Sequence, residues 1–265
     1  FLDTLALEYG ANVHLMDFVT QPEPSRLALN QWAEQKTEQR IKDLLPQGSI
    51  SDATRAVLVN AIYFNAAWKV QFEPSATRDL AFHALSGTRN VPFMNNSQLH
   101  VPSALVDGME VVQLPYDGDE LSMLVVMPAE GQLGALELSL TNAKLASIRA
   151  QLQSSALDLS MPKFEMTFDA ELSEPLKNLG LGPAFDGADF SAMSKQEELA
   201  ITGVLHKAFV KVNEAGTEAA AATAVIVGRV SMPVTRSVKL DRPFVFAIID
   251  NKTSAVTFLG RVTEP

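Results

Sequence analysis

An almost uninterrupted apolar stretch, RAVLVNAIYFNAAW at residues 55–68, limits the folds open to this chain more than any other feature. It is rich in β-branched and aromatic residues, which favour strands, and it is too short to cross a membrane. A strand that lacks polar alternation is covered on both of its faces. We therefore expect this segment to be an inner strand of a layered fold.

Helices are expected on either side of this strand. The spacing of apolar residues predicts a helix within residues 25–48, with Ser25 as a possible cap, and another over residues 133–152. A third helix is expected to follow an alternating segment and to end at Gly180. No composition shift or linker marks a domain boundary, so a single domain over residues 1–265 is expected.

Further strands are expected along the chain. Residues 11–18 alternate like a strand, and residues 82–128 alternate strands with turns, including a hairpin signal at Asp117–Gly118. The tail, residues 239–265, reads as two apolar strands joined at Asn251–Lys252. Because no strand–helix–strand rhythm is visible, the predicted fold class is α+β, with sheets in more than one layer and several helices.

Composition acts mainly by excluding functions. The formal net charge of −10 argues against nucleic acid and anionic membranes as partners, and the absence of cysteine excludes thiol chemistry, disulfides and thiolate metal sites. The four histidines form no metal-binding motif, and no nucleophile elbow, Walker loop or dinucleotide loop occurs. We therefore expect no metal, no cofactor and no catalytic residue.

One late segment, EAGTEAAAATAVIVG at residues 214–228, has no clear structural preference. Alanine favours a helix over residues 218–222, whereas the β-branched residues 225–227 favour a strand. Gly216 suits the interior of neither. The sequence leaves open whether this segment is exposed, helical or extended.

This segment and the motifs around it resemble the serpins. The resemblance rests on KVNEAGTEAAAATAVI followed by DRPFVFAIIDNKTSAVTFLGRVTEP, and on LVNAIYFNAAWKVQF, LSMPKFEM, LHKAFVKV and QWAEQKTEQRIKDLLP in the family's order. It covers essentially the whole chain. It implies the serpin fold, with mainly antiparallel sheets and surrounding helices, and a reactive-centre loop at about residues 214–236.

The resemblance also implies a function, inhibition of a serine protease by a suicide substrate. In serpins the protease cleaves the loop, which then inserts as a strand into the main sheet and traps the enzyme as a covalent acyl-enzyme. A segment that is first loop and later strand needs small side chains and correct alternation. The hinge of this loop comprises Glu214, Gly216, Thr217, Glu218, Ala219, Ala220, Ala221 and Ala222. Such an uncleaved form would be a kinetic trap.

The family's spacing places the cleaved bond at Val230–Ser231, which suits elastase-like or subtilisin-like proteases. Arg229–Val230, one residue earlier, is the second candidate and suits trypsin-like proteases, because their pocket pairs an aspartate with arginine. Met232 is a weaker third. Arg229 is more simply explained as a solvated loop charge.

Four residues outside the loop match positions that control insertion in the family. Lys163 and Trp68 lie where insertion begins, and Lys163 is expected to pair with Glu214. Asn60 and His206 match the polar centre that controls sheet opening. Without the resemblance, a lone His206 in an apolar strand is more simply a hydrogen-bonded core residue.

The chain also departs from the family pattern, because the N-terminal third, with several helices and a strand, is not present. The missing segment of the same protein is therefore an expected partner, beside a protease; no nucleic acid, membrane or second copy is expected. Two rivals remain open, a non-inhibitory serpin that acts as carrier or chaperone and a loop substrate cleaved without trapping. An extracellular location is expected, with prokaryotic cytoplasm or periplasm as the alternative.

Overall fold

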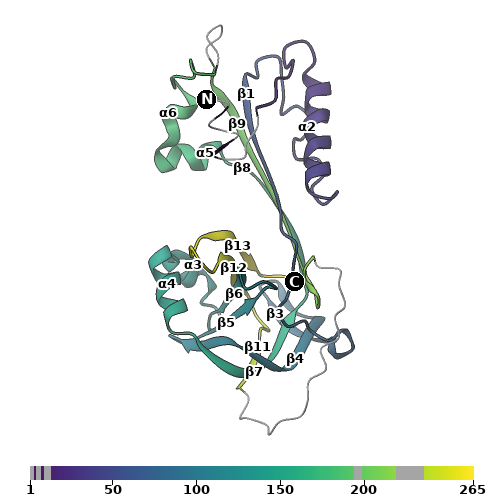
Figure 1. The fold of residues 1–265 in the computed structure, drawn as a ribbon, viewed down its shortest axis with the longest axis vertical. Coiled ribbons are helices and arrows are strands. Elements are labelled where there is room, and N and C mark those ends of the chain that lie inside the picture. The colour runs from purple at the N-terminus through teal and green to yellow at the C-terminus, as the bar shows by residue number, and fades with distance from the viewer. Residues whose placement is uncertain (1–2, 4–6, 9–12, 194–198, 219–235) are drawn as a thin grey trace. The chain divides into compact units, whose positions relative to one another are not determined.

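The computed structural model describes residues 3, 7–8, 13–193, 199–218 and 236–265. The chain divides into two compact units, which are described separately (Figure 1). Unit 1 comprises Phe1–Tyr63 and Met166–Phe209, and unit 2 comprises Phe64–Glu165 and Val210–Pro265. No helix among the described residues has the length and apolar character that crossing a membrane requires.

Unit 1 is built on two long parallel strands, β1 (Ala56–Tyr63) and β9 (Ile201–Val212). Their register pairs Ala56 with Ile201 and Tyr63 with Phe209, and β8 (Phe164–Glu171) is a further neighbour of β9. Among its described residues this unit holds the helices α2 (Pro22–Lys36), α5 (Ser173–Leu176) and α6 (Gly182–Phe185), with the π-helical turn η2 (Lys177–Leu181) between the last two.

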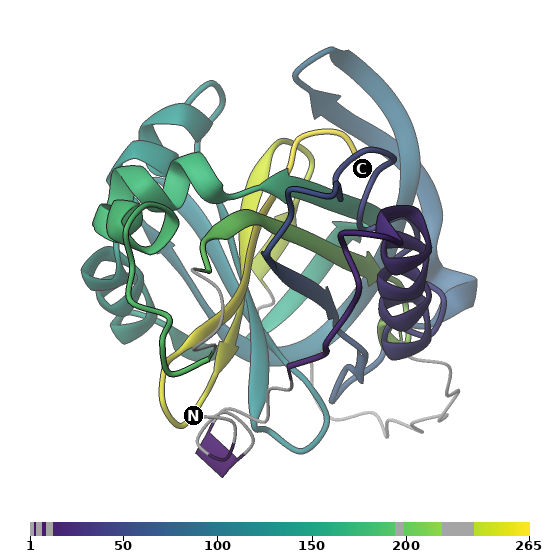
Figure 2. The same ribbon diagram turned by 90° about the horizontal axis from the view of Figure 1, so that it is seen from above.

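The core of unit 1 lies between α2 and one face of β1 (Figures 1 and 2). Val59, Ala61 and Tyr63 pack against a buried cluster that includes Ala33 of α2. Leu58, on the opposite face, is 46% exposed. Among the described residues, the expected cover of this strand is therefore present on one face only.

Unit 2 contains a large, mostly antiparallel sheet in the order β11-β7-β4-β5-β6-β12-β13, with β3 paired to β4. These strands are β3 (Arg78–Ala84), β4 (Gly87–Val106), β5 (Met109–Pro115), β6 (Leu121–Met127), β7 (Gln153–Pro162), β11 (Arg236–Lys239), β12 (Phe244–Asp250) and β13 (Val256–Val262). The unit also holds β2 (Ala66–Ala67), β10 (Gly216–Thr217), the 3-10 turn η1 (Pro74–Ala76), α3 (Leu133–Ser139) and α4 (Asn142–Ala150).

Two apolar layers hold unit 2 together. The first lies between α3 and α4 and one face of the sheet, and includes Leu136, Ile148, Leu124 and Val245. The second is aromatic, since Phe164 contacts Phe244 and Phe246 at ring-centroid distances of 6.1 and 5.4 Å. The buried strands β6 and β12 carry nearly continuous apolar runs because both of their faces are covered.

The hairpins are placed as the sequence predicts, and the helices only in part. Asp117–Gly118 lies in the turn between β5 and β6, and β12 and β13 form the predicted C-terminal pair. The helix expected over 133–152 is two helices, because Thr141 leaves the helical conformation and caps α4 by accepting a hydrogen bond from the backbone N–H of Lys144.

Two local predictions are wrong. Residues 13–17 form no strand, and the first described long helix begins at Pro22, so that Ser25 lies inside it and is buried. Proline at the first helical position explains this start, since it has no backbone N–H to satisfy. The prediction that a helix ends at Gly180 is confirmed, because Gly180 leaves the helical conformation at φ 99° and separates two helices.

Candidate functional site

The candidate site is the beginning of the hinge, residues 214–218, which lies in unit 2 and is bonded into a sheet on both edges. Thr217 in β10 pairs antiparallel with Val212 of β9 and with Ala66 of β2. The backbone N–H of Glu218 donates to the carbonyl of Lys211 at 2.9 Å. The chain therefore enters the sheet just before the alanine tract.

The Thr217 side chain is completely buried, at 0% exposure. Its hydroxyl oxygen lies 2.7 Å from the phenolic oxygen of Tyr116. The Tyr116 ring stacks on Trp68, with ring centroids 4.7 Å apart and an interplanar angle of 10°. Burial raises the pKa of Tyr116 well above its ordinary value, so the phenol keeps its proton and can donate to Thr217.

A tight turn precedes Thr217 and is organised by Asn213. The Asn213 side-chain oxygen accepts hydrogen bonds from the backbone N–H groups of Ala215 at 2.9 Å and Gly216 at 3.2 Å. Its backbone oxygen accepts from the indole N–H of Trp68 at 2.9 Å. The turn is thus held by hydrogen bonds to both the side-chain oxygen and the backbone oxygen of Asn213. It sets the point at which the hinge enters the sheet.

Glycine is the only residue type that the turn geometry tolerates at position 216. Its φ is +156°, and an added Cβ would lie 2.2 Å from the carbonyl oxygen of Ala66. A backbone atom cannot give way as a flexible side chain can. The glycine thus allows β10 to approach β2 closely.

The ion pair expected at the start of the hinge is formed. The Lys163 ammonium lies 2.9 Å from a carboxylate oxygen of Glu214, whose side chain is only 13% exposed. The Thr77 hydroxyl donates to the same carboxylate at 2.7 Å. Glu214 is therefore held from two sides, while its backbone carbonyl accepts from the N–H of Phe72 at 2.9 Å.

Glu214 is expected to make unit 2 sensitive to acid. Burial alone would raise the pKa of this carboxyl, but the hydrogen bonds from Thr77 and Lys163 outweigh burial and the pKa lies below its ordinary value. A lowered folded pKa contributes stability that is present above the unfolded pKa and is lost as pH falls through the folded pKa.

We therefore expect the thermal midpoint to fall more steeply in the wild type than in Glu214→Gln once the pH drops below the ordinary glutamate pKa. Calorimetric melts from about pH 7 to about pH 3 measure this difference. Parallel midpoint curves for the two proteins would contradict it.

The two residues expected at the polar centre lie in unit 1. Asn60 of β1 and His206 of β9 are register partners on adjacent parallel strands. The His206 ring lies 6.3 Å from the ring of Phe168. The structure thus brings these two residues together, and their role in sheet opening stays a prediction.

Part of the predicted loop lies outside the described residues. This applies to Ala219, Ala220, Ala221 and Ala222 of the hinge, and to both candidate bonds, Val230–Ser231 and Arg229–Val230. The described hinge residues are Glu214 to Glu218.

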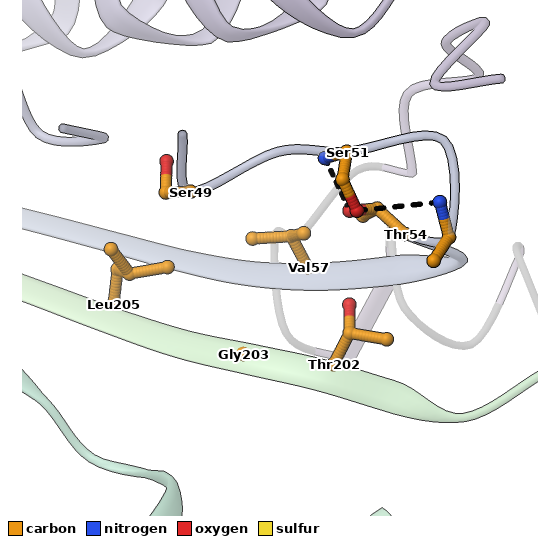
Figure 3. A pocket seen from close by; sticks show the side chains of 8 residues that line it. Ser49, Ser51, Thr54, Val57, Thr202, Gly203 and Leu205 are labelled. Atoms are coloured by element: carbon orange, nitrogen blue, oxygen red, sulfur yellow. Dashed lines mark hydrogen bonds between the residues drawn. The ribbon is translucent and has the colours of Figure 1, made fainter. Parts of the chain in front are cut away.

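A pocket of about 240 Å³ in unit 1 is an alternative candidate site (Figure 3). It is lined by Ser49, Ser51, Ala53, Thr54, Val57, Thr202, Gly203 and Leu205. The Thr54 hydroxyl accepts from the backbone N–H of Ser51 at 2.9 Å, and the Thr202 hydroxyl donates to the carbonyl of Ala56 at 2.8 Å. The described residues that line it include no ionisable side chain, so they supply no general acid or base.

Sequence reasoning missed Tyr116, Asn213 and Thr77. The segment LPYDGDEL indicates a hairpin but not that its tyrosine faces a residue 101 positions away. Asparagine at the first position of a turn with glycine at the fourth is a turn signal, and Asn213 with Gly216 fits it, so this signal could have identified Asn213. Nothing in the sequence singles out Thr77.

Comparison with known proteins supports the resemblance to the serpins along the whole chain. A family model described as "Serpin (serine protease inhibitor)" matches residues 1–265. An uncharacterized serpin-like protein of Methanosarcina acetivorans is 36% identical over 264 residues, which cover 97% of this chain and 61% of that protein. A protein of Cyanea capillata named "Serine protease inhibitor" is 33% identical, covering 98% of this chain and 71% of its own length.

A solved structure of thyroxine-binding globulin in complex with thyroxine superposes on all of this chain and on 70% of its own, with a TM-score of 0.87 and 28% identity. The chain thus spans about three fifths of the length of the Methanosarcina relative and about seven tenths of the other two.

Proposed function

Because this chain belongs to the serpin family, we propose that the natural protein containing it inhibits serine proteases and is consumed in doing so. The protease cleaves the loop that follows Thr217, and the loop then enters the sheet that contains β1 and β9. The enzyme remains attached through an ester. Other members of the fold have other roles, since thyroxine-binding globulin was solved with thyroxine bound.

The observation that carries the proposal is the position of Thr217. It is a small, uncharged residue, fully buried in β10 between β9 and β2, and it lies two residues before the tract Ala219–Ala222. A hinge that must slide into a sheet needs such side chains, because burying a charge there is costly. Because Thr217 is already paired with β9 and β2, the first residue of the inserting strand is in the sheet before the loop is cut.

The pairing of β1 with β9 supplies the second support. These strands are bonded directly to each other, in parallel, over the eight residues of β1. A loop strand that enters between them replaces one parallel ladder by two antiparallel ladders. The net gain is about eight hydrogen bonds, worth about 1 kcal/mol each, or about 8 kcal/mol in all.

The covalent step is acyl transfer. The protease serine oxygen attacks the carbonyl carbon of Val230, the bond to the nitrogen of Ser231 breaks, and the new amino terminus takes up the proton. The product is an ester between Val230 and the protease. Hydrolysis of this ester needs the catalytic geometry of the protease. Insertion of the loop pulls the attached protease along and distorts its active site, so the ester is not hydrolysed.

The test is incubation of the natural protein with elastase, subtilisin and trypsin, followed by a denaturing gel and mass spectrometry. An adduct that survives denaturation and ends at Val230 is expected with elastase or subtilisin; an adduct ending at Arg229 with trypsin identifies the second candidate bond. The control is the same protease with its catalytic serine replaced by alanine, which must give no adduct. Clean cleavage without adduct supports a loop substrate, and an intact loop supports a carrier.

A further inference from the structure

We propose that the Tyr116 hydroxyl is a positioning group that holds Thr217 in the sheet before any protease arrives, so that insertion starts from a docked first residue. This inference rests on the proposed function. It assigns to a tyrosine of the β5–β6 hairpin a part in controlling the loop. The carrying observation is the buried contact of 2.7 Å between the two hydroxyl oxygens.

The position of Tyr116 is fixed from several directions. Its side chain is 1% exposed, it stacks on Trp68, and its ring meets Phe64 edge-on at a centroid distance of 5.0 Å. Its backbone N–H donates to the carbonyl of Leu121 at 3.0 Å, across the hairpin. The phenol therefore reaches Thr217 from a rigid platform.

Trp68 couples this platform to the turn before the hinge. One face of its ring stacks on Tyr116, while its N–H donates to the carbonyl of Asn213. Its backbone N–H also donates to the carbonyl of Ala215 at 2.9 Å. The same tryptophan thus contacts the tyrosine and the turn, and its fluorescence is a direct readout of whether the hinge is docked.

The physical chemistry of the hydroxyl pair predicts a specific mutational pattern. Removing one hydroxyl leaves the other buried without a partner, which penalises the docked hinge, whereas removing both restores a matched apolar pair. Tyr116→Phe and Thr217→Val are each close in shape to the original side chain. A role in packing alone would give no rescue when the two are combined.

We would make Tyr116→Phe, Thr217→Val and the double variant in the natural protein, with Trp32→Phe throughout so that Trp68 is the reporting tryptophan. Ser103→Ala is the control, because Ser103 and Ser155 form a partly buried hydroxyl pair elsewhere in unit 2, at 2.8 Å between β4 and β7. Amide exchange at Glu218, whose N–H bonds to Lys211, measures opening of the hinge.

Each single variant is expected to exchange the Glu218 amide about tenfold faster and to change Trp68 emission, with the double variant within about threefold of wild type. The number of inhibitor molecules consumed per trapped protease should likewise rise in each single variant and return close to the wild-type value in the double variant. Ser103→Ala should change none of these. Additive effects in the double variant, or equal effects of Ser103→Ala, would overturn the proposal.

Amide exchange and fluorescence need no protease, so they separate this inference from the proposed function. If no adduct forms but the double variant is rescued, Tyr116 docks the hinge of a protein that does not inhibit. If adducts form and rescue is absent, inhibition stands and the role of Tyr116 is wrong.

Discussion

Cleavage of the natural protein between Thr217 and Arg236 is expected to raise its thermal midpoint by about 20 °C. β1 and β9 are hydrogen-bonded directly to each other in the uncut chain. Once the loop is cut, it can separate these two strands and pair with both of them as a new strand. A gain of about 8 kcal/mol corresponds to a shift of about 16–32 °C, since 1 kcal/mol moves the midpoint by about 2–4 °C in a domain of this size.

Calorimetry of intact and nicked protein at equal concentration measures this shift. Nicking at a second site, outside residues 214–236, is the control, because a cut elsewhere removes chain connectivity without supplying a strand. A midpoint that stays constant or falls after loop cleavage would contradict insertion. A rise after both cuts would show that the gain does not come from the loop.

The sequence predicted those parts of the fold that depend on local chemistry. The turn at Asp117–Gly118 and the β12–β13 pair follow from turn residues between apolar runs, and both are where they were expected. The sequence predicted the bounds of the helices less well. Proline fixed a start that the apolar spacing placed three residues later, and a single threonine, Thr141, divided one predicted helix into two.

The candidate site divides in the same way. The hinge and the Lys163–Glu214 pair could be expected because the motif KVNEAGTEAAAA resembles a known family. The contact between Tyr116 and Thr217 could not, since it joins residues 101 positions apart and depends on how β10 meets the β5–β6 hairpin. Such a pair carries no signature in either local segment.

Under the proposed function, substitution of the hinge threonine by arginine should convert the natural protein from an inhibitor to a substrate. Thr217 is completely buried, and burial of an unpaired guanidinium costs several kcal/mol even after relaxation. The arginine would therefore keep the hinge out of the sheet. Insertion would then be slower than hydrolysis of the ester, and the protease would be released.

We expect Thr217→Arg to be cleaved at the same bond as the wild type while the fraction of protease trapped falls by about tenfold or more, which corresponds to about 1.4 kcal/mol in the competition between insertion and hydrolysis. Thr88→Arg, at an exposed threonine near the start of β4, is the matched control and should trap protease normally. The uncleaved variants should melt within a few degrees of the wild type, which separates a hinge effect from failure to fold. Because the strand gained on insertion begins at Thr217, normal trapping by a folded Thr217→Arg protein would show that the loop does not enter the sheet at β10.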